Sequence, residues 1–151
     1  MSSHWKTLIR HSGLYVLLQT VTAGALVLLA PWRNFGLVNY LGLALGGGVM
    51  LWSLGTLRMK QLSVLPEARR DGELITTGPY RFVRHPMYTG LLIATASTLT
   101  ISTLATLGWG WILLLIVLDL KSRREEKSLL ATYPGYAAFR GSRGKFFPGV
   151  Y

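Results

Sequence analysis

Long apolar runs separated by short basic segments dominate the pattern along this chain. The first run covers residues 13–30, holds the polar Gln19 but no charged side chain, and is ended by Pro31. The second run, residues 35–57, is uncharged throughout. Each has about the 20 residues that an α-helix needs to cross a bilayer core of about 30 Å. The two runs therefore predict two transmembrane helices.

A third apolar run, residues 91–118, is too long for one upright helix, and Gly108-Trp109-Gly110 interrupts it. The preferred interpretation is a hairpin of two shorter, tilted helices, about 88–106 and 108–120, with one long tilted helix as the alternative. Residues 1–151 are then a single all-α domain, an integral membrane bundle of about four transmembrane helices.

The charge pattern orients this bundle. There are 16 Lys and Arg against 6 Asp and Glu, a net charge of +10, and the mean hydropathy is +0.37. The basic residues cluster between the apolar runs, which favours anionic lipid headgroups as partners and gives no reason to expect nucleic acid. Basic segments lie on the cytoplasmic side, so we expect loop 58–87, segment 121–151 and the N-terminus there, with Arg33 outside. The first apolar run is interpreted as a retained helix rather than a cleaved signal.

Polar residues that could carry chemistry gather in loop 58–87 and at the start of the third apolar run. Gly78-Pro79 predicts a turn, and Pro86 suits the first position of a helix. His85 and Tyr88 would then lie at a helix N-terminus, where backbone N–H groups favour an anion. The alternative is that these side chains only anchor the helix at the membrane interface.

A second polar cluster, Glu125-Glu126, follows the last apolar run. It could bind a cationic group, or belong to a solvated charged helix. There is no cysteine, so thiolate catalysis and cysteine-based zinc sites are excluded, and no metal site is expected.

Together the two clusters resemble the isoprenylcysteine carboxyl methyltransferase and phospholipid methyltransferase family of membrane enzymes. The similarity covers residues 72–148, and the first two helices match only as generic spans. The matching residues are Leu74-Ile75-Thr76-Thr77-Gly78-Pro79-Tyr80, Arg84-His85-Pro86-Met87-Tyr88-Thr89-Gly90, Glu125-Glu126 with Leu129, Tyr136, and Phe147-Pro148. Phe139, the turn Tyr133-Pro134-Gly135 and Lys121 depart from the family pattern.

The resemblance implies methyl transfer from S-adenosyl-L-methionine to a lipid-soluble acceptor, in a pocket at the cytoplasmic face. The acceptor would be a prenylcysteine-like carboxylate or a phospholipid amine headgroup. Carried over from the family, the cofactor-binding residues are Gly72, Glu73, Leu74, Ile75, Tyr80, His85, Pro86, Met87, Tyr88 and Glu125, and Lys121 is a substrate residue. The cofactor carboxylate suits His85, its ammonium suits Glu125, and its adenine suits Leu74 and Ile75.

Several alternatives stay open. Glu125, Glu126, His85 and Tyr88 are all possible bases, and none is singled out as catalytic. An NADPH-dependent reductase related to sterol reductases, or a non-enzymatic membrane scaffold, are the other functions considered. Gly46-Gly47-Gly48 predicts either close helix packing or a cofactor surface. Small residues in the third run, including Ala94 and Ser97, predict either a lateral entry for the acceptor or close helix packing.

Overall fold

The computed structural model describes residues 3–57, 74–100 and 103–150, with side chains from residue 13 onward. The described residues form helices and no strands. In chain order the elements are α1 (Ser3–Leu28), η1 (Trp32–Asn34), α2 (Leu37–Thr56), η3 (Gly78–Arg81), α3 (Pro86–Ala96), α4 (Leu104–Thr132) and α5 (Tyr136–Ser142). The all-α prediction is confirmed for the described part of the chain.

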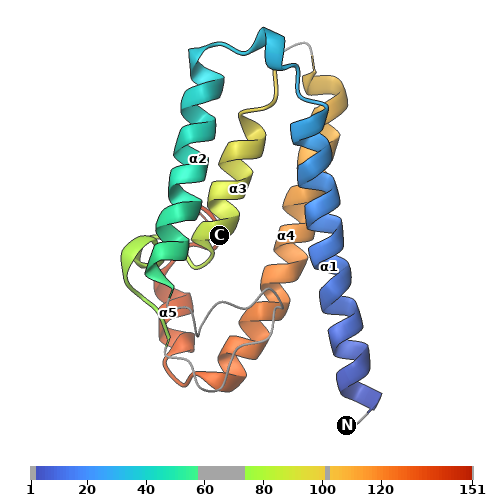
Figure 1. Ribbon diagram of the computed structural model, residues 1–151. Coiled ribbons are helices and arrows are strands. Elements are labelled where there is room, and N and C mark those ends of the chain that lie inside the picture. The colour runs from blue at the N-terminus through green and yellow to red at the C-terminus, as the bar shows by residue number, and fades with distance from the viewer. Residues whose placement is uncertain (1–2, 58–73, 101–102, 151) are drawn as a thin grey trace.

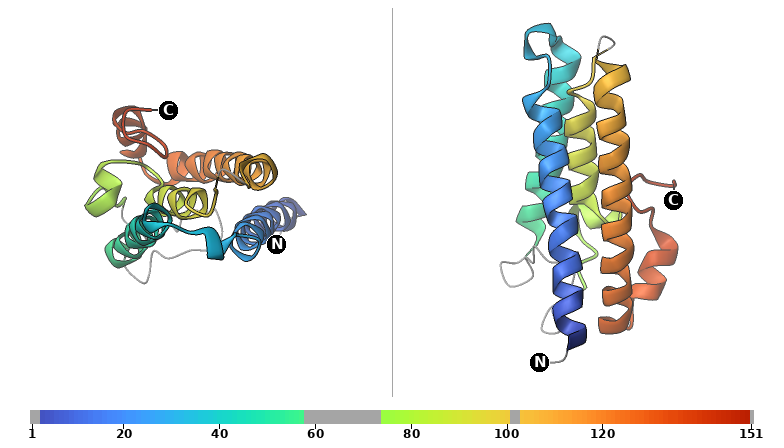
Figure 2. Two further views of the ribbon diagram at one scale, coloured as in Figure 1. Left: turned by 90° about the horizontal axis from the view of Figure 1, so that it is seen from above. Right: turned by 90° about the vertical axis from the view of Figure 1, so that its right-hand side faces the viewer.

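The four longer helices form one elongated bundle (Figure 1). Seen from above, they follow one another in the order α2, α3, α4, α1 (Figure 2). α2 packs mainly on α3, α1 packs mainly on α4, and the two pairs meet where α3 contacts α4. The N-terminus and α5 lie at one end of the bundle, and η1 lies at the other (Figure 1).

The third apolar run is a hairpin, as preferred from the sequence, but it turns earlier than expected. α3 ends at Ala96, and the Gly108-Trp109-Gly110 segment lies inside α4. The hydroxyls of Thr95, Ser97 and Thr98 donate to backbone carbonyls of the last turn of α3. Such bonds compete with helix continuation, whereas a glycine inside a helix costs only about 1 kcal/mol. A predicted break at Gly108 was therefore wrong.

The small residues of α3 serve close packing against α2. A Cβ built on Gly46 would lie 2.5 Å from the backbone nitrogen of Ala94 and 2.6 Å from the carbonyl oxygen of Gly90. A Cβ on Gly42 would overlap the hydroxyl of Ser97. The predicted acceptor entry beside Ala94 and Ser97 is therefore wrong, because α2 occupies that space.

Only part of the bundle meets the length expected of membrane spans. Among the described residues, α2 and α4 are long and apolar enough to cross a membrane, while the apolar part of α1, Gly13–Leu28, is shorter. α3 has 11 residues and rises about 16 Å, roughly half of a bilayer core. Large apolar side chains point outward, such as Val38 at 81% exposure. The prediction of four spans stays a prediction.

Candidate functional site

The candidate site lies at the end of the bundle that holds α5, where the turn before α3 meets the polar end of α4. Gly78 starts η3 with a positive φ of 58°, and a Cβ there would lie 2.5 Å from the Thr56 hydroxyl of α2. A glycine is therefore required for the turn to pack on α2. α3 then begins at Pro86 with His85 as its N-cap, as the sequence predicted.

The C-terminal segment returns to this turn and fixes it. Val83 and Gly144 form a parallel β-bridge. The backbone N–H of Arg84 donates to the Gly144 carbonyl at 2.9 Å, and that of His85 donates to the Lys145 carbonyl at 3.1 Å. The backbone of Arg84 and His85 is thus held by hydrogen bonds to the C-terminal segment, which restricts the positions of both side chains before any ligand binds.

Glu125 organises one half of the site. The Tyr88 hydroxyl donates to Glu125 Oε1 at 2.5 Å, and His85 Nδ1 lies 3.4 Å from Glu125 Oε2. The rings of His85 and Tyr88 stack with centroids 5.4 Å apart. Tyr80 is close enough for the charge of Glu125 to act on its phenol. One carboxylate and two phenol rings therefore meet beside the imidazole.

Glu126 organises the other half. Its Oε1 accepts from Arg84 Nη1 at 2.8 Å and lies 3.1 Å from His85 Nε2, while its Oε2 lies 3.2 Å from Arg140 Nε of α5. The side chains of Arg84 and Glu126 are only 8% and 4% exposed. Neighbouring helix residues point about 100° apart, so Glu125 and Glu126 serve different sides of α4.

The two carboxylates change the ionisation of their neighbours. Burial by itself lowers the pKa of His85, but the hydrogen bonds and negative charges of Glu125 and Glu126 outweigh it, so the pKa is raised. Burial, with a smaller effect from the Glu125 charge, raises the pKa of Tyr80 to about 12. His85 is therefore favoured as an imidazolium between two carboxylates, and Tyr80 stays a neutral phenol at ordinary pH.

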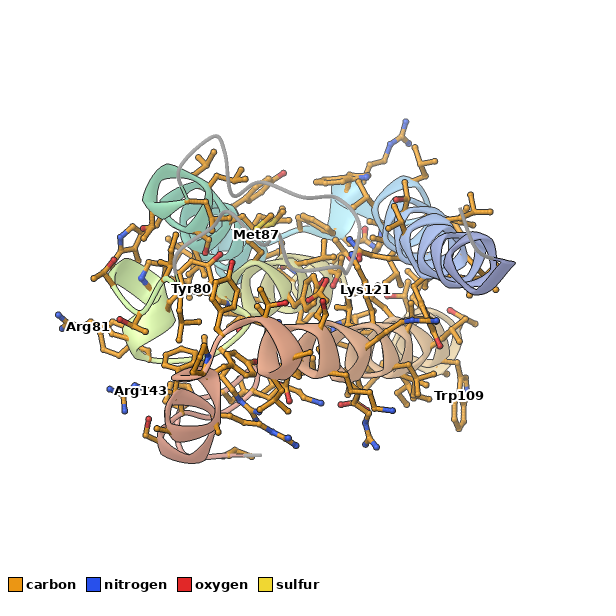
Figure 3. All side chains as sticks on the ribbon, turned by 90° about the horizontal axis from the view of Figure 1, so that it is seen from below. Tyr80, Arg81, Met87, Trp109, Lys121 and Arg143 are labelled. Carbon is orange, nitrogen blue, oxygen red and sulfur yellow. The ribbon has the colours of Figure 1, made fainter. Side chains whose placement is uncertain are left out.

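Lys121 lies beside the same cluster, within the bundle. It is 5% exposed, donates from Nζ to Gln19 Oε1 of α1 at 2.9 Å, and lies 5.1 Å above the ring of Tyr88. Figure 3 shows Lys121, Tyr80 and Met87 on the side of α4 that faces α1 and α2, whereas Arg143 lies toward α5. Lys121 is therefore a buried positive charge beside the Glu125 cluster, and it could attract a negatively charged group of a ligand.

The structure brings together five of the nine predicted site residues that it describes. Tyr80, His85, Tyr88, Glu125 and Lys121 form one connected set. The remaining described ones are the helix-starting Pro86, half-buried Met87 and Ile75, and half-buried Leu74, which lies near Gly135 in the turn before α5. Gly72 and Glu73 lie outside the described residues.

Sequence reasoning missed the partners that lie far away along the chain. Lys145 Nζ donates to Asp119 Oδ1 at 2.6 Å, and the Thr89 hydroxyl donates to the Phe146 carbonyl at 2.6 Å. Phe146 packs edge-on against the rings of His85 and Tyr88. One local feature of the sequence indicates that Asp119 has a partner. It is a charged side chain at the end of an apolar run, where an unpaired charge is unfavourable.

The Glu125 half of the site contains groups that can attract a cation. A carboxylate supplies charge, and phenol rings present negative faces to a cation within about 6 Å. Both nitrogens of His85 already face carboxylates, so in this arrangement the imidazole positions Glu125 and Glu126. The described residues contain no group of three or more His, Cys, Asp or Glu that could hold a metal ion.

Comparison with known proteins gives a curated relative and a family model. A curated relative is the cobalt-zinc-cadmium resistance protein CzcN of Cupriavidus metallidurans, 28% identical over 105 residues that cover 67% of this chain. Those residues cover 47% of the relative, so the chain spans about half of its length. No solved structure matches the chain. The family model described as phospholipid methyltransferase matches residues 18–135, most of the chain and nearly all of the site, and the chain therefore belongs to the phospholipid methyltransferase family.

Proposed function

We propose that this protein transfers a methyl group from S-adenosyl-L-methionine to a lipid-soluble acceptor at a membrane surface. The observation that carries the proposal is the cluster of Glu125, Tyr88 and Tyr80 at the polar end of the bundle, which we interpret as a cation site. S-adenosylmethionine carries a sulfonium and an ammonium, the kind of groups such a cluster attracts. Membership of the family supports methyl transfer as the reaction.

In this proposal the residues around Glu125 have stated roles. Glu125 binds the cofactor ammonium or faces the sulfonium, and the ring of Tyr80 adds cation–π attraction. Tyr88 holds Glu125 in place through its hydroxyl. His85 is a positioning residue that lies beside Glu125 Oε2, while Tyr88 donates to Oε1. Leu74, beside the turn at Gly135, offers apolar surface for the adenine.

The chemistry needs alignment more than activation. The acceptor atom forms a bond to the methyl carbon while the bond from that carbon to sulfur breaks, and neutral S-adenosylhomocysteine leaves with the electron pair. Holding donor and acceptor in line supplies most of the rate enhancement in such a displacement. A carboxylate acceptor needs no base, whereas an amine has to lose a proton, and Glu125 is the candidate to accept it.

The acceptor proposed is a prenylcysteine-like carboxylate or a phospholipid amine. The family description supports the phospholipid, and the buried cation of Lys121, beside Tyr88, would attract either a carboxylate or a headgroup phosphate. The acceptor chain does not enter between α2 and α3 at Ala94 and Ser97, because those helices are in close contact there.

The protein is a membrane protein by its family and its apolar helices. We place both termini and the site on the cytoplasmic side, which leaves Arg33 on the other. The N-terminus and α5 lie at the same end of the bundle and η1 at the opposite end, in support of this arrangement (Figure 1). Reporter fusions at residues 34, 70 and 151 test it, and an external signal at 70 would contradict it.

Binding of the cofactor is the direct test of the proposed function. The purified protein in nonionic detergent is titrated calorimetrically with S-adenosylmethionine and, separately, with NADPH. Binding of NADPH alone would instead support a reductase, and binding of neither would remove the enzyme proposal.

Glu125→Gln should weaken S-adenosylmethionine binding by about 1.5 to 3 kcal/mol, roughly 10- to 150-fold, because the negative charge that pairs with the cofactor ammonium is removed. Arg33→Ala, an exposed charge at the opposite end of the bundle, is the control and should bind as the unmodified protein does. Extracted lipids and a prenylcysteine analogue, incubated with labelled cofactor, then identify the acceptor. Equal affinity in Glu125→Gln and the unmodified protein would remove Glu125 from the site.

A further inference from the structure

A pocket lies on the side of α4 that carries Glu126, and Glu125 is not among its lining residues. It is a recess of about 340 Å³ at the polar end of the bundle. From α4 it is lined by Arg123, Glu126, Lys127 and Leu130, which lie at the spacing of a single helix face. The other lining residues come from three separate segments and are Arg84, Arg140 and Lys145.

The recess is strongly cationic. Five of its lining side chains are Lys or Arg and one is a carboxylate. Glu126 is shared between Arg84 and Arg140, and Asp119, just outside the lining, pairs with Arg123 and Lys145. Within the described part of the chain, these two carboxylates do not balance the five cations. Gathering unbalanced like charges is unfavourable, so an anion bound in the recess would stabilise this end of the bundle.

Two details indicate that donors remain for a ligand. Lys127 has neither an ion pair nor a hydrogen bond with any described residue. Arg84, with its side chain only 8% exposed, leaves its Nε without a hydrogen-bond partner within the described part of the chain. Buried polar groups in proteins are normally satisfied, and an unsatisfied guanidinium nitrogen points to a missing acceptor.

The location fits the headgroup level of a membrane. The lining residues of α4 begin just past its apolar part, in the polar segment after residue 121. Lys and Arg at that depth attract anionic lipid headgroups.

We propose that this recess binds a phosphate group, carried by a phospholipid headgroup or by a soluble phosphate. Guanidinium forks match phosphate oxygens in pairs, and the ammonium of Lys127 adds a point charge. A recess of about 340 Å³ is at the lower end of the size range of ligand pockets and is larger than a single ion needs. The site is distinct from the cation site at Glu125 and does not depend on methyl transfer.

The test measures phosphate binding without cofactor or acceptor. The full chain in nonionic detergent is titrated with inorganic phosphate, and separately with short-chain phosphatidylglycerol, whose phosphorus signal is followed by nuclear magnetic resonance. We expect saturable binding, about fivefold weaker in Lys127→Ala and at least about tenfold weaker in Lys127→Glu, since an attractive charge is removed or reversed. The fold does not depend on Lys127, because that side chain has no partner among the described residues.

The matched control is Arg143→Ala, which removes an exposed positive charge beside the recess but outside its lining. It should bind phosphate as the unmodified protein does. Binding of the lipid alone assigns the site to a headgroup, and binding of both probes, or of inorganic phosphate alone, supports a site for phosphate as such. Saturable binding of neither probe, an equal loss in Arg143→Ala, or displacement of the probes by S-adenosylmethionine would overturn the proposal. The first two of these outcomes leave S-adenosylmethionine binding at Glu125 untouched, whereas displacement would place the cofactor in the recess instead of at Glu125.

Discussion

Replacing Glu126 by glutamine separates the roles of the two adjacent carboxylates. Glutamine has nearly the same size as glutamate and still accepts a hydrogen bond, so the change removes the charge and little else. Glu126 lies 2.8 Å from Arg84 Nη1, 3.1 Å from His85 Nε2 and 3.2 Å from Arg140 Nε. The variant therefore leaves three positively charged or protonatable groups without their shared counter-charge.

The loss of stability follows from these contacts. A hydrogen bond to a charged group contributes about 1.5 to 3 kcal/mol, against about 0.5 to 1.5 kcal/mol for a neutral one. The contacts with Arg84 and His85 are buried and lose this difference in full, while Arg140 is half exposed and contributes at most about 0.5 kcal/mol. The free energy of unfolding should fall by about 2 to 3 kcal/mol. This is less than the roughly 3 to 5 kcal/mol for deleting one partner of a buried pair.

Urea unfolding in nonionic detergent, followed by the fluorescence of the five tryptophans, measures this loss. Glu125→Gln is the matched comparison, because its side-chain carbonyl can still accept from the Tyr88 hydroxyl and its other contact, to His85 Nδ1, is longer at 3.4 Å. That variant should lose about 1 kcal/mol or less. A loss in Glu126→Gln no greater than in Glu125→Gln would refute the structural role assigned to Glu126.

Three further predictions concern stability. His85 has a raised pKa in the folded protein, so its contribution to stability is complete below about pH 6.5 and is lost as the pH rises through the folded pKa. The urea midpoint of unfolding should therefore fall as the pH rises through that window. In His85→Gln the urea midpoint should change less with pH. Gly46→Ala should lower the free energy of unfolding by about 1 to 3 kcal/mol, because the added Cβ meets the backbone of α3. Gly47→Ala has open space around its Cβ and should raise the free energy of unfolding by about 0.5 to 1 kcal/mol. Equal urea midpoints for the two variants would contradict this. Lys145→Met should cost about 2 to 4 kcal/mol by leaving Asp119 without its buried partner, and a second change, Asp119→Leu, should recover part of that loss in the same unfolding assay.

The helices could be predicted from the sequence because apolar runs and prolines are local signals. The position of the hairpin turn could not be predicted. The helix could end at the hydroxyl residues after Ala96 or at the glycines around Gly108, and the free energies of these two endings differ by only about 1 kcal/mol. In the structure the turn follows Thr95 and Thr98, whose hydroxyls donate to backbone carbonyls near the end of α3. The same holds for Ala94 and Ser97, whose small size fits an entry path as well as a helix contact until the position of α2 is known.

Site residues that belong to local motifs could be named from the sequence. Contacts made by the C-terminal segment, which is distant along the chain, could not. His85, Tyr88 and Glu125 follow from spacing and from the resemblance to a family. The division of labour between Glu125 and Glu126 depends on how α4 is rotated about its axis, which two adjacent glutamates do not reveal. Phe146 covers the site from the C-terminal segment, and its contacts with His85 and Tyr88 carry no signal within the motif itself.

His85 connects the two sides of α4, and this connection follows from helix geometry. Because neighbouring residues point about 100° apart, two adjacent glutamates reach two different sides, and only a group lying over the helix between them can touch both. His85 does so, with Nδ1 3.4 Å from Glu125 and Nε2 3.1 Å from Glu126. A cation bound at Glu125 competes with the imidazolium for that carboxylate and disfavours the proton, whereas an anion in the recess favours it. The two proposed ligands therefore act on the charge of one imidazole in opposite directions.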